Sequence, residues 1–261
     1  MPYKKAGWFT TARDLAALEL LQIVISKIKE GFLPLEISYV FVSKEKGESE
    51  ISDKLINYAE SEGLKVITFS ALRFEKELRK ENRELWRKRY HEEVLKRLPE
   101  EGDFGVLAGY MWVVSEEMCK KLNLINLHPA LPGGPKGTWQ EVIWQIISAR
   151  GCETGIMMHK VTPELDEGPA LSFVRFSIRT DEFKKLWEEA DKILLKHHLS
   201  GLQKLQGESC RLFKKIREEG VKRELPLIVY TLKYLAEGKI SFDDENLPVD
   251  LSEEVERYIR S

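Results

Sequence analysis

Short apolar runs alternate with longer helical patterns over the first two-thirds of the chain, and this alternation limits the fold more than any other feature. Five runs are rich in β-branched and aromatic residues, as in strands buried on both faces of a sheet. They are Gly7–Thr10, Glu36–Ser43, Lys65–Phe69, Phe104–Ala108 and Leu124–Leu127. Apolar residues three to four positions apart predict helices between them, at Thr11–Lys29, Ser49–Glu62 and Arg73–Leu98. Because such alternation forms βαβ units, we predict an α/β fold with a Rossmann-like, mostly parallel sheet flanked by helices.

The pattern changes after residue 127. A loop rich in Pro and Gly leads into a helix, and two longer apolar runs then predict an antiparallel extension of the sheet. These segments are the loop Pro129–Gly137, the helix Trp139–Ala149, and the strands Thr154–Thr162 and Ala170–Ile178, which Pro163–Gly168 joins.

The C-terminal third is predicted to be mainly helical. Charged helical patterns cover Arg179–Glu219, with a break near Ser200–Gly201, and a further helix covers Pro226–Glu237, with Pro226 suited to its first turn. A small strand and a terminal helix are expected within residues 239–261. We therefore predict a main domain over residues 1–180 and an extra C-terminal helical segment, residues 181–261, packed on the same domain.

Composition argues against several classes of partner. Lys and Arg number 41 and Asp and Glu 43, a net charge of −2, so nucleic acid and anionic membranes are not expected as partners. No apolar stretch approaches the roughly 20 residues of a membrane span, and the first residues lack the apolar run of a signal peptide. The three cysteines are far apart, which predicts reduced thiols. A cytoplasmic protein without a metal site is the expectation; the oligomeric state stays open.

Three short segments carry residues suited to chemistry. Asn126 and His128 project to the same side at the end of a predicted strand, where ligands gather in parallel sheets. There they could hold a carbonyl oxygen and move protons, or instead cap a turn and fill the core. The loop Glu164–Pro169 offers a carboxylate that could accept a proton, or is a tight turn. The strand end at Val106–Met111 contains Gly, which allows a flat ligand to approach the backbone.

Together, these segments resemble the formyltransferase family, which includes glycinamide ribonucleotide, methionyl-tRNA and sugar N-formyltransferases. The match is strong over residues 104–178 and looser over residues 7–100. The matching text is Leu107-Ala-Gly-Tyr-Met, Asn126-Leu-His-Pro-Ala-Leu-Pro, Gly134-Pro-Lys-Gly, Glu153-Thr-Gly-Ile-Met-Met-His and Glu164-Leu-Asp-Glu-Gly-Pro.

The resemblance implies that the chain passes a formyl group from 10-formyltetrahydrofolate to a primary amine, without a metal. It places the catalytic roles on Asn126, His128 and Asp166, with His159 beside the pocket or simply in a strand. It implies that folate is bound by Leu107, Gly109, Met111, Trp112, Val114, Val161, Thr162 and Leu165.

Other residues depart from the family pattern and leave the acceptor open. The loop Thr10–Asp14 lacks the family's glycines; Thr10, Thr11 and Arg13 could hold a phosphate, or Thr11 could be a helix N-cap. Trp112 stands where the family usually has Arg. Glycinamide ribonucleotide of purine biosynthesis is ranked first among acceptors, then a nucleotide-linked amino sugar, water as in a formyltetrahydrofolate hydrolase, and tRNA. A folate- or nucleotide-binding protein without turnover is the non-enzyme alternative.

Two charged helical segments also contain histidines. Arg and Lys alternate with Glu in Arg73–Leu98, which predicts a solvated, ion-paired face, with an RNA-binding face as the alternative. His91 in this segment, and His197 and His198 in the later one, are predicted to lie on the surface.

Overall fold

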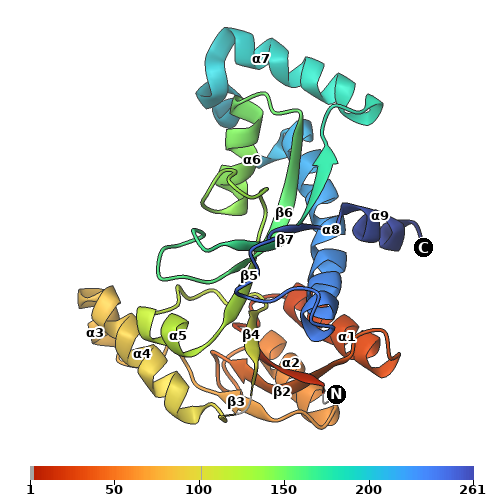
Figure 1. Cartoon of the computed structure of the whole chain (residues 1–261). Helices are drawn as coiled ribbons and strands as arrows, with labels where there is room; N and C mark the ends of the chain where they lie inside the picture. The colour runs from red at the N-terminus through yellow and green to blue at the C-terminus, as the bar shows by residue number, and fades with distance from the viewer. Residues whose placement is uncertain (1–2, 101) are drawn as a thin grey trace. The chain divides into compact units, whose positions relative to one another are not determined.

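The structure is a computed structural model that describes residues 3–100 and 102–261 (Figure 1). Among these residues the strand order is β3-β2-β1-β4-β5-β6-β7-β8. The strands are β1 Lys4–Thr10, β2 Leu35–Val42, β3 Val66–Thr68, β4 Phe104–Leu107, β5 Leu124–His128, β6 Glu153–Lys160, β7 Ala170–Ser177 and β8 Val249–Asp250. β1 pairs in parallel with β2 and β4, β2 with β3, β4 with β5, and β7 with β8. The predicted α/β fold with a mostly parallel sheet is confirmed.

The helices follow the predicted order with several different boundaries, and one short helix between β4 and β5 was not predicted. They are α1 Leu15–Lys29, α2 Glu50–Ser61, α3 Lys76–Glu81, α4 Arg83–Arg97, α5 Glu116–Lys121, α6 Trp139–Ser148, α7 Asp181–Leu205, α8 Arg211–Ala236 and α9 Ser252–Arg260, with a 3₁₀ turn at Gly207–Ser209. The connection from β6 to β7 is the predicted antiparallel hairpin. Lys160 N–H donates to Pro169 O at one end of it, and Ile178 N–H to Cys152 O at the other.

The chain forms two compact units. The first unit contains the residues up to 126, His159–Pro169 and Thr231–Asp244; the second contains Leu127–Met158, Ala170–Tyr230 and Glu245–Ser261. The division at residue 180 that the sequence suggested stays a prediction.

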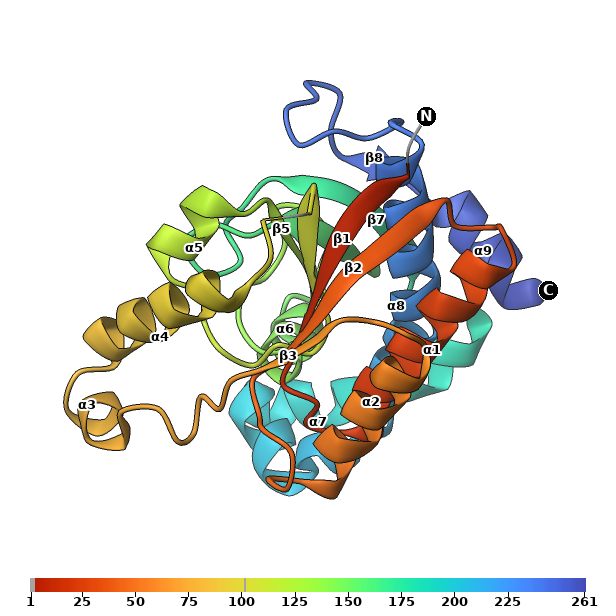
Figure 2. The same cartoon turned by 90° about the horizontal axis from the view of Figure 1, so that it is seen from below.

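In the first unit, Figure 2 shows α1 and α2 on one face of the strands and α4 and α5 on the other. The second of these faces buries an aromatic cluster. The rings of Trp86 and Tyr90 on α4 stack with centroids 5.1 Å apart, and Tyr90 stacks on Phe69 at 5.3 Å. Phe9 and Phe41 of β1 and β2 are fully buried in the same cluster. This packing fixes α4 against the sheet despite its many charged residues.

Two helix boundaries in the first unit differ from the prediction. α1 begins at Leu15, not Thr11, because Asp14 is its N-cap and accepts from Ala17 N–H. The single helix predicted over residues 73–98 is interrupted at Asn82, whose extended backbone ends α3 and whose side chain caps α4 by accepting from Leu85 N–H at 3.0 Å. Asn satisfies the unpaired N–H groups of a new helix, which makes such an interruption stable.

Two helices, α7 and α8, also differ from the prediction. A separate helix starting at Pro226 was predicted, but α8 runs through Pro226 without interruption. The fully buried Leu227 and Val229 on its next turn supply packing that offsets the hydrogen bond lost at proline. The break expected near Ser200–Gly201 lies at His198, where φ is 55°. His197 and His198 are exposed, as predicted.

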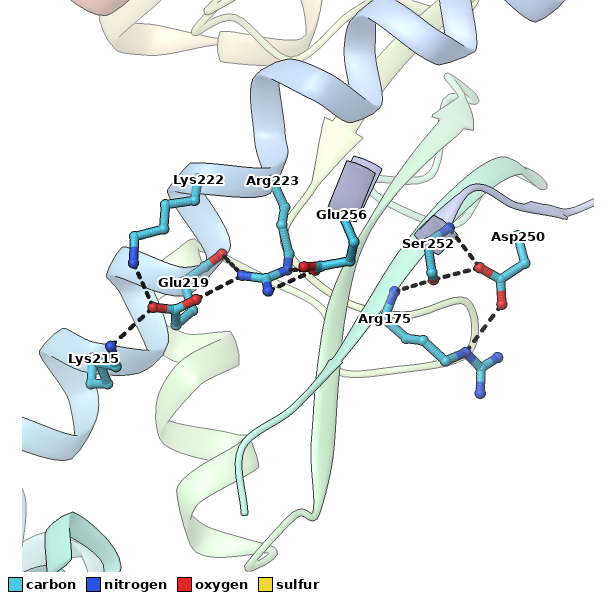
Figure 3. Close-up of polar contacts among 8 residues, drawn as sticks. All are labelled: Arg175, Lys215, Glu219, Lys222, Arg223, Asp250, Ser252 and Glu256. Atoms are coloured by element: carbon cyan, nitrogen blue, oxygen red, sulfur yellow. Dashed lines mark hydrogen bonds and ion pairs between the residues drawn. The ribbon is translucent and has the colours of Figure 1, made fainter. Parts of the chain in front are cut away.

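An ion network joins α8 to α9 (Figure 3). Glu219 on α8 contacts Lys215, Lys222 and Arg223, and Arg223 also contacts Glu256 on α9 at 2.7 Å. Burial alone would raise the pKa of Glu219, but the hydrogen bonds from these three cations lower it to about 2. The carboxylate is therefore ionised throughout the neutral range.

Candidate active site

A pocket of about 160 Å³ lies in the first unit, after the carboxyl end of β4. Seven residues predicted to bind folate line it: Leu107, Met111, Trp112, Val114, Val161, Thr162 and Leu165. Asn126 and Asp166, two of the predicted catalytic residues, also line it, together with His159, Tyr110 and Val113. The structure thus brings together two segments more than forty residues apart in sequence, which follow β4 and β6, the strands on either side of β5.

The wall of the pocket is mainly apolar. Met111, Val113 and Leu165 are 53%, 37% and 60% exposed, which is unusual for such side chains when they cluster. An apolar pocket with a few polar groups is typical of a site for a small, flat molecule. The exposed apolar rim would be covered by such a ligand.

Gly109 does not line the pocket. Its φ of +69° is a conformation that glycine adopts without strain, and its carbonyl accepts from Thr11 N–H at 3.1 Å. Gly109 therefore forms the turn after β4, and its contact with folate stays a prediction.

The Thr10–Asp14 loop forms hydrogen bonds to the segment that lines the pocket. Thr11 is buried, and its hydroxyl accepts from Met111 N–H at 2.9 Å and from the Ser43 hydroxyl at 3.0 Å. Ser43 in turn accepts from Trp112 Nε1–H at 3.2 Å. The fully buried Thr10 uses its hydroxyl to accept from Ala12 N–H at 3.0 Å. These contacts position the pocket wall.

Arg13 differs from its two threonine neighbours. Its side chain is exposed, and one guanidinium nitrogen lies 3.9 Å from the sulfur of Met111. Of the three residues predicted to bind an acceptor phosphate, Arg13 is the one with a charged, exposed side chain. Phosphate binding by Thr10, Thr11 and Arg13 stays a prediction.

A strained turn places Asp166 in the pocket. Its φ of 57° is left-handed, which Asp tolerates better than most residues. Gly168 makes this turn possible, because a Cβ there would lie 1.7 Å from the carbonyl oxygen of Lys160. Strain of this kind concentrates at functional sites.

His159 faces the same carboxylate. Its Nε2 lies 3.8 Å from Asp166 Oδ1, while Nδ1 is 3.0 Å from the Lys160 carbonyl oxygen. Since a carbonyl oxygen can only accept, Nδ1 carries a proton, and a second proton on Nε2 would form an ion pair with Asp166. The sequence left open whether His159 lies beside the pocket or is simply a strand residue, and the structure places it at the pocket.

His128 belongs to the second unit and is buried. Its Nε2 lies 2.9 Å from the carbonyl oxygen of Pro135, so Nε2 carries a proton. The Pro- and Gly-rich loop after β5 thereby orients the ring. A catalytic role for His128 stays a prediction.

Within residues 3–100 and 102–261, no three or more His, Cys, Asp and Glu side chains are grouped so that they could hold a metal ion. None of the helices in this part of the chain is both long and apolar enough to cross a membrane.

His91 is a residue of this region that sequence reasoning missed. It was predicted to lie on the surface, but its side chain is fully buried where α4 packs against the pocket segment. Tyr110 and Val113 were also not singled out, although they lie within the matching segment. Nothing in the charged pattern around His91 distinguishes it from a solvated residue.

The fold and the pocket define an α/β protein built to hold a small, largely apolar ligand beside an amide and a carboxylate. The chain belongs to the formyl transferase family, whose model matches residues 21–191. Phosphoribosylglycinamide formyltransferase of Schizosaccharomyces pombe is 30% identical over 115 residues, which are 41% of this chain and 56% of that enzyme. The match thus spans little more than half of this relative.

Solved structures of similar fold come from several bacteria. Glycinamide ribonucleotide transformylase 1 of Symbiobacterium toebii has a TM-score of 0.59 at 17% identity, covering 90% of this chain and 88% of its own. The phosphoribosylglycinamide formyltransferase of Coxiella burnetii gives the same values. Formyltetrahydrofolate deformylase of Burkholderia mallei has a TM-score of 0.55 at 20% identity, covering 90% of this chain and 66% of its own. At these identities the likeness establishes the fold.

Proposed function

We propose that this protein transfers the formyl group of 10-formyltetrahydrofolate to a primary amine, with glycinamide ribonucleotide as the first acceptor to test. The observation that carries the proposal is a pocket of the first unit that gathers Asn126, Asp166 and His159 against an apolar wall. Family membership and the names of the similar proteins support it.

The pocket residues suit direct transfer. The acceptor nitrogen forms a bond to the formyl carbon, and the bond from that carbon to N10 of the folate breaks. The Asn126 amide donates to the oxyanion that develops on the formyl oxygen. Asp166 takes the proton that the acceptor nitrogen loses, directly or through a water, and this proton passes on to N10 as the bond to the formyl carbon breaks.

The apolar wall supports a folate as the donor. The pteridine ring is flat and carries hydrogen-bonding groups on its edge, so it fits between apolar side chains and backbone groups. Trp112 adds an indole ring to this wall, where the family usually has Arg, and provides a surface for stacking.

An activity assay with matched variants tests the proposal. The purified protein is mixed with 10-formyltetrahydrofolate and glycinamide ribonucleotide, and tetrahydrofolate release is followed. We expect turnover in the wild type and a loss of at least about 100-fold in Asp166→Asn and Asn126→Ala. Asp243→Asn removes the same charge from an exposed loop of the same unit and serves as the control. Equal activity in Asp166→Asn and the control would refute the assigned roles.

The alternatives give different results in the same assay. Release of tetrahydrofolate without any amine would identify a hydrolase, a reading that the similar fold of the deformylase keeps open. Turnover only with a nucleotide-linked amino sugar would change the acceptor. Folate binding without turnover, in the wild type and in Asn126→Ala alike, would indicate a binding protein.

A further inference from the structure

We propose that His91 is a positioning residue, which holds the segment Tyr110–Ser115 in the shape that forms the wall of the folate pocket. This inference rests on the proposed function for the identity of the ligand. It rests on the geometry of the first unit for the role of the histidine.

Both ring nitrogens of His91 bond to the same short segment. Ser115 N–H donates to Nδ1 at 3.2 Å, and Nε2 lies 3.0 Å from the Tyr110 hydroxyl oxygen. Because a backbone N–H can only donate, Nδ1 accepts, and the neutral ring carries its proton on Nε2 and donates it to Tyr110. One side chain thus fixes the first and last residues of the segment.

The residues between these two tethers form the pocket wall. Met111, Trp112, Val113 and Val114 all line the pocket, and so does Tyr110 itself. His91 is not a lining residue and is fully buried on α4, where it cannot contact a ligand. It therefore acts through the segment that it holds.

The tethers are themselves anchored in the aromatic cluster. The Tyr110 ring packs edge-on against Phe9 and is 93% buried, and its hydroxyl also interacts with that of Tyr90. Tyr90 donates to the Phe69 carbonyl at 2.8 Å. A chain of hydrogen bonds thus connects the pocket segment to the strands, and its members position one another.

Charged groups near the His91 ring do not make it take up a second proton. Arg87 on α4 disfavours the protonated ring through its charge, whereas its carbonyl oxygen and Glu117 on α5 favour it. Burial is the largest effect and keeps the ring neutral, with Nδ1 available as the acceptor for Ser115.

Three substitutions at residue 91 separate the two tethers. His91→Asn keeps an acceptor where Nδ1 lies, His91→Gln keeps a donor that reaches Tyr110, and His91→Leu keeps neither. His197→Gln, at an exposed histidine of α7, is the control. Thermal unfolding and circular dichroism establish that each variant folds; if His91→Leu does not, the Asn and Gln variants and Tyr110→Phe carry the comparison.

Affinity for 5-formyltetrahydrofolate, measured by calorimetry, is the first readout. We expect His91→Leu to weaken binding about tenfold, which corresponds to the loss of two ordinary buried hydrogen bonds, and the Asn and Gln variants to fall between it and the wild type. In the transfer assay, KM for 10-formyltetrahydrofolate should rise about tenfold with kcat changed less than about twofold, because the residue does not touch reacting atoms. Wild-type affinity and KM in a folded His91→Leu protein would overturn the inference.

Hydrogen exchange of the backbone amides provides the second readout and requires no ligand. The amides of residues 111–115 should exchange faster in His91→Leu than in the wild type, with those of β1 unchanged. If the wild type binds no folate, the proposed function fails, and the exchange rates still decide whether His91 holds the segment. Unchanged exchange would refute the inference whatever the ligand proves to be.

Discussion

His91 should make the stability of the protein depend on pH in a narrow range. Burial lowers the pKa of its imidazole from the ordinary 6.5 to about 4, since no solvent reaches the ring and Nδ1 already accepts from Ser115. The unfolded chain therefore binds a proton between about pH 6.5 and pH 4 that the folded chain excludes. Where the unfolded state binds more protons, stability rises with pH, so this contribution is complete above pH 6.5 and is lost as the pH falls.

The size of the effect follows from the two pKa values. Between pH 7 and pH 5 the folded state should lose about 2 kcal/mol of free energy of unfolding, and about 3 kcal/mol by pH 4. The interval between pH 7 and pH 5 is the informative one. The Glu219 carboxyl has a folded pKa of about 2, and its unfolded form, with the ordinary pKa of 4.5, is still mostly ionised at pH 5.

Urea unfolding of the wild type and His91→Gln at pH 7 and pH 5 measures this contribution. The variant should be less stable at pH 7, because it loses the Nδ1 acceptor, but its stability should change by about 2 kcal/mol less between the two values. Histidines common to both proteins cancel in this difference. Equal losses of stability in the two proteins would show that residue 91 titrates normally in the folded state and would refute the assigned burial of a neutral ring.

Two further predictions concern packing and charge. Gly168→Ala should destabilise the protein by at least about 2 kcal/mol, because the new Cβ meets the carbonyl oxygen of Lys160, whereas Gly220→Ala on α8 has open space and should be neutral or stabilising; equal thermal midpoints would contradict this. Arg223→Met should cost about 2 kcal/mol in urea unfolding, because Glu219 keeps its lysine partners but loses the most buried cation of the network. A change below about 0.5 kcal/mol would show that the network behaves as an exposed one.

The strands and the two pocket segments could be predicted from the sequence alone. Buried parallel strands must be short and apolar, and the helices between them must repeat their apolar residues every three to four positions, so both leave a pattern that a single sequence displays. The segments 107–114 and 161–166 both lie within the stretch that resembles the family, and the first of them follows a parallel strand, at whose carboxyl end ligands bind. The pocket that contains Asn126 and Asp166 agrees with this expectation.

Other features depended on contacts between residues far apart in sequence. Thr11 was expected to cap a helix or hold a phosphate; Asp14 caps α1 instead, and the approach of β4 to β1 directs the Thr11 hydroxyl to Met111 N–H. α8 passes through Pro226 because tertiary packing outweighs a local preference. His91 lies in a helix in which most residues are charged, and the local pattern does not reveal that the histidine side chain points inward. Only the packing of α4 against the pocket segment does so, since the two hydrogen bonds that bury the ring come from residues 19 and 24 positions away.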